Sequence, residues 1–284
     1  MNTLQLLSPA KINLYLKVIG KRPDDYHDLH MIMTKVSLFD NITLTFNNKE
    51  LSLSCDKPGV PLGEDNIAWK AASIFMTEKK IQTGLHIDIK KRIPMGGGLG
   101  GGSSNAASVL MGINTLFGCP AGRDELMEMG LKLGADVPFF IFKGAAIAEG
   151  VGEKLRPVKD LPRLRVVLLN PGIEISTASI FRKLNLRLTK SAESLSINCF
   201  NFSLSRVIDN LYNDLEKVTL QSYPQVARAR DILLNNGAAG VLMSGSGSTV
   251  FGLYKDDITA ENALSGINKD IGSGCWFVCL VHSI

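Results

Sequence analysis

The sequence predicts an α+β fold in two domains, and three observations lead to this prediction. Residues 85–90 alternate between apolar and polar side chains, as in a half-buried strand, whereas apolar residues between 106 and 117 recur at helical spacing. A length of 284 residues suits one large domain or two ordinary ones. The polar stretch VGEKLRPVKD, which begins at residue 151, lies between two apolar halves. We therefore expect a first domain over residues 1–155 and a second over residues 156–284.

Composition and charge narrow the class of protein. The chain is 45% hydrophobic and 20% charged, as expected of a globular protein with a substantial core. Its net charge of +4 suits an anionic small molecule and is too weak to indicate a nucleic-acid partner. No apolar run approaches the length of a membrane span, and residues 1–13 lack the features of a signal peptide. We therefore expect neither a membrane nor a nucleic-acid partner.

The cysteines indicate a reducing compartment. There are five, an odd number, without a CxxC pair, so we expect reduced thiols and a cytoplasmic protein. We expect Cys275 and Cys279 to lie on one face of the last strand and to pack in the core rather than to bind zinc.

Periodicity and turn residues predict the remaining elements. In the first half of the chain we expect a strand over 4–19, strands over 31–46 with Asn41 near their turn, a helix from Asn66 or Ile67 to residue 80, a helix over 123–134, and a strand and turn over 144–155. In the second half we expect a strand over 163–170, a short helix carrying Thr177 and Phe181, and a helix or loop outside the core over 184–200. Helices over 203–220 and 223–237, a glycine-serine loop that leads into a strand within 243–254, a helix over 259–271 and a strand over 276–281 should follow.

The most informative stretch is PMGGGLGGGSSNAAS, residues 94–108, with six glycines in seven positions. It follows the strand over 85–90 and leads into the helix that ends near 117, with Ser103 or Ser104 as the expected N-cap. Free amides at a helix N-terminus attract anions, and glycine lets the backbone curl around a phosphate. We therefore predict a phosphate-binding loop. The alternative is a flexible linker, which rarely runs from a strand directly into a capped helix.

Known nucleotide motifs do not describe this loop well. No Lys-Ser or Lys-Thr follows the last glycine, so it is not a Walker A loop. The spacing of Gly96, Gly98 and Gly101 fits the dinucleotide pattern, but so many glycines would fit almost any pattern.

Several polar residues are candidates for chemistry, each beside a simpler interpretation. Lys11 and Asn13 project from the same side of one strand, where a solvated face is the simpler interpretation. Tyr26 and His27 lie together in a turn-rich loop, where they are candidates for stacking on a flat ring. Asp136 precedes an apolar run, so it is either an N-cap, a catalytic carboxylate made more basic by its apolar neighbours, or both.

The segment MSGSGSTVF near the C-terminus contains a second glycine-serine loop, residues 244–249. Its simpler interpretation is an ordinary hairpin turn. The alternative is a lid or prop against the first glycine loop.

Four segments together, PAKINLYLKV, PMGGGLGGGSSNAA, GADVPFF and MSGSGSTVF, resemble the GHMP kinase superfamily in sequence and order. With DDYHDLH added, the chain is most similar to the branch that acts in the non-mevalonate pathway of isoprenoid biosynthesis, whose acceptor is a cytidyl diphosphate derivative of methylerythritol. The resemblance covers essentially the whole chain. It implies a two-domain GHMP kinase fold, an ATP-binding domain with a left-handed β-α-β crossover, a C-terminal substrate-binding domain, and an active site in the interdomain cleft.

The resemblance also implies roles for particular residues. Asp136 would take the proton from the acceptor hydroxyl, and Lys11 would orient that hydroxyl and stabilise negative charge. ATP would be the co-substrate, with Mg²⁺ touched by Ser103 or Ser104. The ATP-binding residues would be Pro94, Met95, Gly96, Gly97, Gly98, Leu99, Gly100, Gly101, Gly102, Ser103 and Ser104; the substrate-binding residues Asn13, Tyr26, His27, Thr177 and Phe181; and the supporting loop Ser244, Gly245, Ser246, Gly247, Ser248 and Thr249.

Two alternatives stay open at this point. Another GHMP kinase, for mevalonate, homoserine or a sugar, would not need Tyr26 and Phe181 to enclose a pyrimidine. A non-catalytic nucleotide-binding module would use the glycine loop only to hold phosphate.

Overall fold

The structure is a computed structural model that describes residues 3–47, 49–184, 203–272 and 274–284. Cys199 and most of the helix or loop expected over 184–200 lie outside the described residues. The chain forms two compact units that interleave along the sequence: unit 1 comprises residues 1–10, 38–93 and 100–143, and unit 2 comprises residues 11–37, 94–99 and 144–284. The division at residue 155 into an ATP-binding and a substrate-binding domain remains a prediction.

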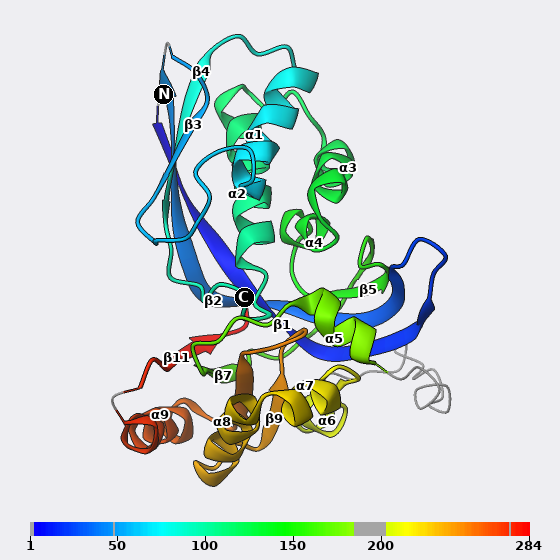
Figure 1. The fold of residues 1–284 in the computed structure, drawn as a ribbon, viewed down its shortest axis with the longest axis vertical. Helices are drawn as coiled ribbons and strands as arrows, with labels where there is room; N and C mark the ends of the chain where they lie inside the picture. Colours follow the sequence, from blue (N-terminus) through cyan, green and yellow to red (C-terminus); the bar gives the residue numbers. More distant parts are fainter. Residues whose placement is uncertain (1–2, 48, 185–202, 273) are drawn as a thin grey trace. The chain divides into compact units, whose positions relative to one another are not determined.

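Unit 1 consists of a sheet with helices on one face (Figure 1). Its strands lie in the order β3 (Ser52–Cys55), β4 (Gly84–Lys90), β2 (His27–Asn47) and β1 (Thr3–Lys21), and the last two strands continue into unit 2. The helices are α1 (Ile67–Glu78), α2 (Gly101–Leu116), α3 (Arg123–Leu133) and α4 (Val137–Ile141).

Strands β3 and β4 are parallel neighbours, and α1 connects them, so they form a β-α-β unit. The left-handed sense of the crossover remains a prediction. Helix α1 begins where predicted because the side chain of Asn66 accepts a hydrogen bond from the Ala68 amide, at 2.9 Å. This cap satisfies one of the amides that a helix N-terminus leaves without a partner.

Helix α2, which follows the glycine loop, packs closely against α1 and the sheet. The buried alanines Ala71, Ala72 and Ala106 on the two helices leave room for a close approach. At Gly112, an added Cβ would lie 2.4 Å from Leu6 Cδ1 and 2.6 Å from Leu44 Cδ1. The position of the helix that extends the loop is therefore set by tight packing in unit 1.

Unit 2 contains an antiparallel sheet in the order β11, β7, β10 and β9, which α8 and α9 contact (Figure 1). The remaining parts of β1 and β2 also belong to this unit, where β2 pairs with β5 and β1 pairs with β8. The elements are β5 (Ala146–Gly150), β6 (Lys154–Pro157), β7 (Arg165–Asn170), α5 (Thr177–Lys183), α6 (Leu204–Asp209), β8 (Tyr212–Asn213), α7 (Glu216–Ser222), α8 (Pro224–Asn235), β9 (Gly240–Met243), β10 (Val250–Tyr254), α9 (Asp257–Ile271) and β11 (Phe277–His282).

Most predicted elements are present, but the predictions for residues 31–46, for residues 203–220 and for Cys275 are wrong. Strand β2 runs through Asn41 without a turn, because its two halves pair with different strands, β5 and β4. The helix expected over 203–220 is two short helices separated by β8. Cys275 precedes β11 and is exposed, so it does not share a strand face with Cys279.

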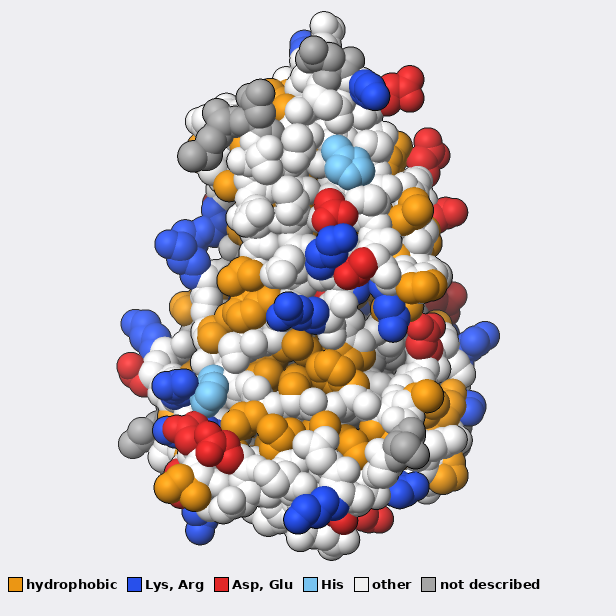
Figure 2. Space-filling model, turned by 90° about the vertical axis from the view of Figure 1, so that its left-hand side faces the viewer, with side chains coloured by type: hydrophobic (Ala, Val, Ile, Leu, Met, Phe, Trp, Pro, Cys, Tyr) orange, Lys and Arg blue, Asp and Glu red, His pale blue; other side chains and the backbone are white. Residues whose placement is uncertain are grey.

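The surface is consistent with the modest net charge. On the face drawn in Figure 2, Lys and Arg side chains are interspersed with Asp and Glu side chains. Within the described part of the chain, no helix is long and apolar enough to cross a membrane.

Candidate functional site

The first half of the glycine loop, in unit 2, is held by its backbone carbonyls. Four consecutive carbonyl oxygens each accept a hydrogen bond: Gly96 from the Ile175 amide at 3.4 Å, Gly97 from the Thr249 amide at 3.1 Å, Gly98 from the Ser244 hydroxyl at 3.0 Å, and Leu99 from the Lys11 amide at 3.0 Å. These donors come from three separate segments of unit 2: strand β1, the stretch before α5, and the loop between β9 and β10. The loop is therefore fixed by the rest of its unit and is not a flexible linker.

The anchored carbonyls determine where the amides of the loop point. In a trans peptide the carbonyl and the following N–H point in opposite directions. The N–H groups of Gly97, Gly98, Leu99 and Gly100 are therefore directed away from the groups that hold the carbonyls. Backbone amides that are free of such partners in a glycine-rich turn are favourable for binding an anion.

Gly98 must be glycine for two reasons. Its φ of +75° lies in the left-handed region, and an added Cβ would lie 2.0 Å from the Ser244 carbonyl oxygen. The second obstacle is backbone, so a small shift of a side chain would not relieve it.

The second half of the loop becomes helix earlier than the sequence suggested. Helix α2 begins at Gly101, and its N-cap is Gly100 in the left-handed conformation, so the prediction of Ser103 or Ser104 as N-cap is wrong. Ser104 instead lies in the first turn, fully buried, where its hydroxyl accepts a hydrogen bond from Ser8 Oγ at 2.8 Å. The N-terminus of α2 is formed by small residues, so its backbone amides can be approached closely.

Lys11 and Asn13 on β1 are buried in unit 2, at 4% and 1% exposure, so the prediction of a solvated face is wrong. Lys11 Nζ donates to Asn13 Oδ1 at 2.6 Å, and the backbone N–H of Asn13 donates to Ser244 Oγ at 3.4 Å. A Cβ added to Gly245 would lie 3.6 Å from Lys11 Nζ. The backbone of Lys11 therefore anchors the glycine loop, while its ammonium lies beside the loop of residues 244–249.

The loop of residues 244–249 fits both interpretations made for it. It connects the antiparallel strands β9 and β10, so it is a hairpin turn. Through Ser244 and Thr249 it also donates to the glycine loop, so it is a prop for that loop. Two glycine-rich loops, residues 96–99 and 244–249, and the buried ammonium of Lys11 therefore lie together within unit 2.

Two buried asparagines that the sequence did not single out stabilise these loops. Asn170 Nδ2, at the end of β7, donates to Ser248 Oγ at 3.1 Å and to Thr249 Oγ1 at 2.9 Å. Asn213 Nδ2 donates to the carbonyls of Met243 and Gly245 at 2.8 and 2.7 Å. Neither residue lies in a recognisable motif, and only the three-dimensional arrangement reveals them.

Asp136 lies in unit 1 at the N-cap position of the short helix α4. Its side chain accepts no capping hydrogen bond from that helix, so capping does not account for this residue. The flanking side chains of Val137, Phe139 and Phe140 are buried, while Asp136 itself is half-buried. Asp136 is therefore a carboxylate that retains access to solvent beside an apolar segment. Asp136 and Lys11 belong to different units, and the pairing of their roles remains a prediction.

The residues expected to bind the substrate lie in unit 2, and their rings are arranged differently from the expected sandwich. The His27 ring stacks on Phe181 of α5, with centroids 4.6 Å apart and planes at 23°. Tyr26 is 60% exposed. Thr177 Oγ1, at the start of α5, lies 2.8 Å from Ser246 Oγ, so α5 contacts the supporting loop. The sandwich of a ring between Tyr26 and Phe181 remains a prediction.

The surroundings of His27 affect its protonation. Partial burial is the main cause that lowers the pKa of His27 below its usual 6.5, and the nearby charge of Lys21 lowers it further. The imidazole is therefore neutral at pH 7, with one nitrogen that donates and one that accepts hydrogen bonds.

We predict that Gly98→Ala lowers kcat/KM for ATP by about 100-fold or more, since the amides that we expect to bind phosphate would lose their positions. Steady-state kinetics at varied ATP concentration measures this. Gly20→Ala is the matched control in the same unit, because a Cβ there meets nothing within 4 Å. Equal kinetics for the two variants would contradict the role assigned to the loop.

We also predict that Phe181→Ala raises the pKa of His27 toward 6.5, because removal of the stacked ring hydrates the imidazole. Titration of the histidine ring signals by NMR measures this change. Since the folded protein disfavours the charged ring, the wild type should lose stability as pH falls below 6.5, and this loss should be smaller in the variant. A pKa of His27 that is unchanged in the variant would show that the stack does not cause the shift.

Comparison with known protein families supports the sequence resemblance. Residues 66–144 match the GHMP kinases N terminal domain, and residues 188–271 match the GHMP kinases C terminal domain. A relative from Geobacter sp. (strain M21), named 4-diphosphocytidyl-2-C-methyl-D-erythritol kinase, is 49% identical over 285 residues, which cover 100% of both chains. A relative of the same name from Syntrophotalea carbinolica is 47% identical over 94% of this chain and 95% of its own.

Solved structures agree with these relatives. The crystal structure of a 4-(cytidine 5'-diphospho)-2C-methyl-D-erythritol kinase matches with a TM-score of 0.81 and 34% identity, over 98% of this chain and 99% of that chain. A homoserine kinase from Cytophaga hutchinsonii matches with a TM-score of 0.76 at 18% identity, over 100% of this chain and 95% of that chain, and this likeness concerns the fold alone. The chain belongs to the GHMP kinases and, within them, to the family of 4-diphosphocytidyl-2-C-methyl-D-erythritol kinases.

Proposed function

We propose that this chain transfers the γ-phosphoryl group of ATP to the 2-hydroxyl of 4-diphosphocytidyl-2-C-methyl-D-erythritol, as a step of isoprenoid precursor biosynthesis by the non-mevalonate route. The products would be ADP and the 2-phosphate of the acceptor. The observation that carries this proposal is the glycine loop with its four anchored carbonyls, in a chain whose full-length relatives bear the name of this kinase.

The glycine loop would bind the triphosphate through its amides. Phosphoryl transfer needs positioning and neutralisation of charge more than covalent chemistry. Amides whose carbonyls are already bound need no reorganisation during the reaction, which is the condition for strong electrostatic stabilisation. The N-terminus of α2 adds the positive end of a helix dipole to the same continuous stretch of chain.

Asp136 and Lys11 would act on the acceptor hydroxyl. Asp136 would accept the hydroxyl proton while the oxygen forms a bond to the γ-phosphorus and the bond from that phosphorus to the ADP oxygen breaks. Lys11 would donate a hydrogen bond to the same hydroxyl oxygen and stabilise its growing negative charge. The hydrogen bond from Lys11 Nζ to Asn13 Oδ1 supports a fixed position for the ammonium.

Magnesium is expected with ATP, and we propose that most of its ligands are phosphate oxygens. The described residues contain no group of three or more His, Cys, Asp or Glu side chains that could hold a metal. Of the two serines proposed to touch the ion, Ser104 is buried and accepts a hydrogen bond from Ser8, whereas Ser103 is partly exposed. Ser103 would therefore be the protein ligand. The ion would neutralise charge on the transferred phosphate.

The cytidine end of the acceptor would bind at Phe181. We propose that the cytosine ring takes the place that His27 occupies on Phe181 and is covered on its other face by Tyr26. His27 would then turn to the edge of the base, where a neutral imidazole can both donate and accept. Stacking of this kind contributes about 1–3 kcal/mol per base in nucleic-acid complexes. Asn13 and Thr177 would contact the polyol or phosphate part.

The alternatives are less well supported. Solved homoserine and mevalonate kinases share the fold at 15–18% identity, whereas the relatives that act on the cytidyl compound by name are 42–49% identical. A non-catalytic nucleotide-binding module is disfavoured because these full-length relatives are named as kinases. Location in the cytoplasm and the lack of nucleic-acid or membrane partners remain predictions from composition.

The direct test is ATP-dependent phosphorylation of a panel of acceptors by the purified protein, with product detected by mass spectrometry. We expect turnover of 4-diphosphocytidyl-2-C-methyl-D-erythritol and none of homoserine, mevalonate or galactose. Turnover of another acceptor alone would retain a GHMP kinase and reject the cytosine site. Binding of ATP without turnover of any acceptor would support the binding module.

We predict that Asp136→Ala lowers kcat by about 10²–10⁴, the usual loss for a missing general base. If Lys11 and Asp136 act on one hydroxyl, the double variant with Lys11→Ala should lose much less than the product of the two single losses. Rapid-quench measurement of single turnovers isolates the chemical step. Multiplicative losses in the double variant would contradict a shared target, and near-normal turnover of Asp136→Ala would reject it as the base.

A further inference from the structure

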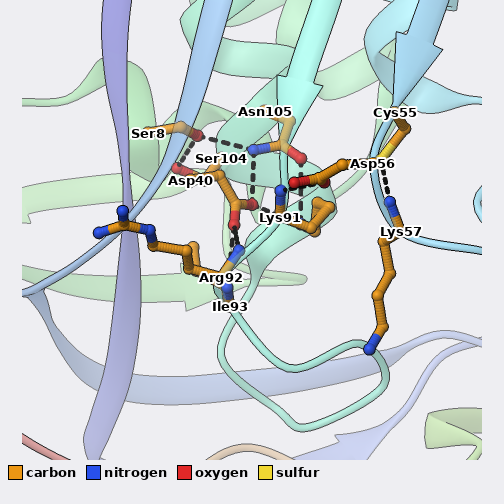
Figure 3. Close-up of polar contacts among 10 residues, drawn as sticks. All are labelled: Ser8, Asp40, Cys55, Asp56, Lys57, Lys91, Arg92, Ile93, Ser104 and Asn105. Atoms are coloured by element: carbon orange, nitrogen blue, oxygen red, sulfur yellow. Dashed lines mark hydrogen bonds and ion pairs between the residues drawn. The ribbon is translucent and has the colours of Figure 1, made fainter.

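A buried polar cluster in unit 1 has no part in the chemistry proposed above. Its members are Ser8, Asp40, Lys91, Ser104 and Asn105, shown with their neighbours in Figure 3. Asp40 is fully buried in the middle of β2, and the side chain of Lys91 is 7% exposed. Burial of charged groups is costly unless they are paired and hydrogen-bonded, so this cluster calls for an explanation.

The carboxylate of Asp40 accepts four hydrogen bonds. Oδ1 accepts from the backbone amides of Arg92 and Ile93, at 2.7 and 2.9 Å. Oδ2 accepts from Asn105 Nδ2 at 2.9 Å and forms a short ion pair with Lys91 Nζ. Every acceptor position of this buried anion is thereby occupied, and two of its donors are backbone groups whose position it fixes.

The partners of Asp40 lie at both ends of the glycine loop. Residues 91–93 lead directly into the loop at Pro94, and Asn105 lies in the first turns of α2, where the loop has ended. Asn105 Nδ2 also donates to Ser8 Oγ at 3.0 Å, and Ser8 Oγ donates to Ser104 Oγ. One side chain on β2 therefore holds the entrance and the exit of the loop together in unit 1.

Lys91 adds a charge to this arrangement. Its Nζ lies 3.1 Å from Asn105 Oδ1, and a Cβ added to Gly101 would lie 3.2 Å from it. Gly101 is the first residue of α2, so the ammonium lies beside the helix end that carries the partial positive charge. Asp40 offsets this repulsion and holds the ammonium in place.

We propose that Asp40 is a positioning residue for ATP: by binding residues 91–93 and Asn105, it fixes the separation and direction of the two ends of the glycine loop, and so the positions of the loop amides. The inference rests on the proposed function of the loop in binding the triphosphate. The competing explanation is that the cluster only fastens β2 to α2 and contributes to the stability of unit 1.

The test compares Asp40→Asn with Asn114→Ala in the full-length protein. Asn keeps an oxygen for the two backbone amides but loses the negative charge that holds Lys91. Asn114 is a matched control, since it is buried at the other end of α2 and hydrogen-bonds the Ala121 amide and carbonyl at 2.9 and 3.1 Å. Two readouts are measured: hydrogen exchange of the amides of residues 96–103 without ligand, and separate KM values for ATP and for the acceptor.

For Asp40→Asn we expect roughly tenfold faster exchange in residues 96–103 and about a tenfold increase in KM for ATP, since small displacements of positioning groups have effects of this size or larger. KM for the acceptor should change less than about twofold. Asn114→Ala should lower the melting temperature without either change. If Asp40→Asn does not fold, Asp40→Asn combined with Lys91→Met leaves no buried charge unpaired and still lacks the oxygen that accepts a hydrogen bond from Asn105 Nδ2.

The inference would be overturned if Asp40→Asn had a lower melting temperature but the same loop exchange and the same KM for ATP as the wild type. The role of the cluster would then be to stabilise unit 1. Failure of the proposed function can be distinguished from failure of this inference. A wild type that does not turn over ATP would reject the kinase activity. The exchange measurement is made without ligand, so it would still decide whether Asp40 orders the loop.

Discussion

The structure depends most on the hydrogen bonds that hold the carbonyls of Gly96–Leu99. A glycine-rich segment has the largest conformational entropy to lose on ordering, so without these bonds it would sample many conformations. Their donors are the amides of Lys11, Ile175 and Thr249 and the hydroxyl of Ser244. Because each carbonyl is bound, each following amide has a fixed direction. The phosphate site proposed here thus depends on the donors that hold the carbonyls of the loop.

This constraint explains why segments far apart in the sequence carry conspicuous small and polar residues. Lys11 anchors the loop through its backbone and places its ammonium beside Gly245. The loop of residues 244–249 approaches Gly98 so closely that position 98 must be glycine. Asn170 and Asn213 hold the loop of residues 244–249 through hydrogen bonds. In unit 1, Asp40 binds the chain on either side of the glycine loop. Each of these groups positions a loop or the chain next to it, and none of them needs to contact phosphate to influence its binding.

Much of the fold and the position of the glycine loop could be predicted from the sequence, because strand, glycine loop and helix are adjacent and each has a local signal. The start of α2 could not, because Gly100 in the left-handed conformation caps the helix before the serines are reached. The burial of Lys11 was missed because strand alternation does not reveal what covers a face. Asp40 has no local signal either, since a single aspartate in a strand becomes notable only when Lys91 and Asn105 surround it.

The central claim is that the amides of Gly97–Gly100 bind phosphate because hydrogen bonds hold the carbonyls of the preceding residues, Gly96–Leu99. The measurement that tests it most directly is an amide NMR titration of the ¹⁵N-labelled protein with a non-hydrolysable ATP analogue and Mg²⁺, with adenosine as the comparison ligand. We expect large downfield shifts of the amide protons of residues 97–100 with the ATP analogue and small shifts with adenosine. Saturable binding of the ATP analogue that leaves these amides unshifted would contradict the account.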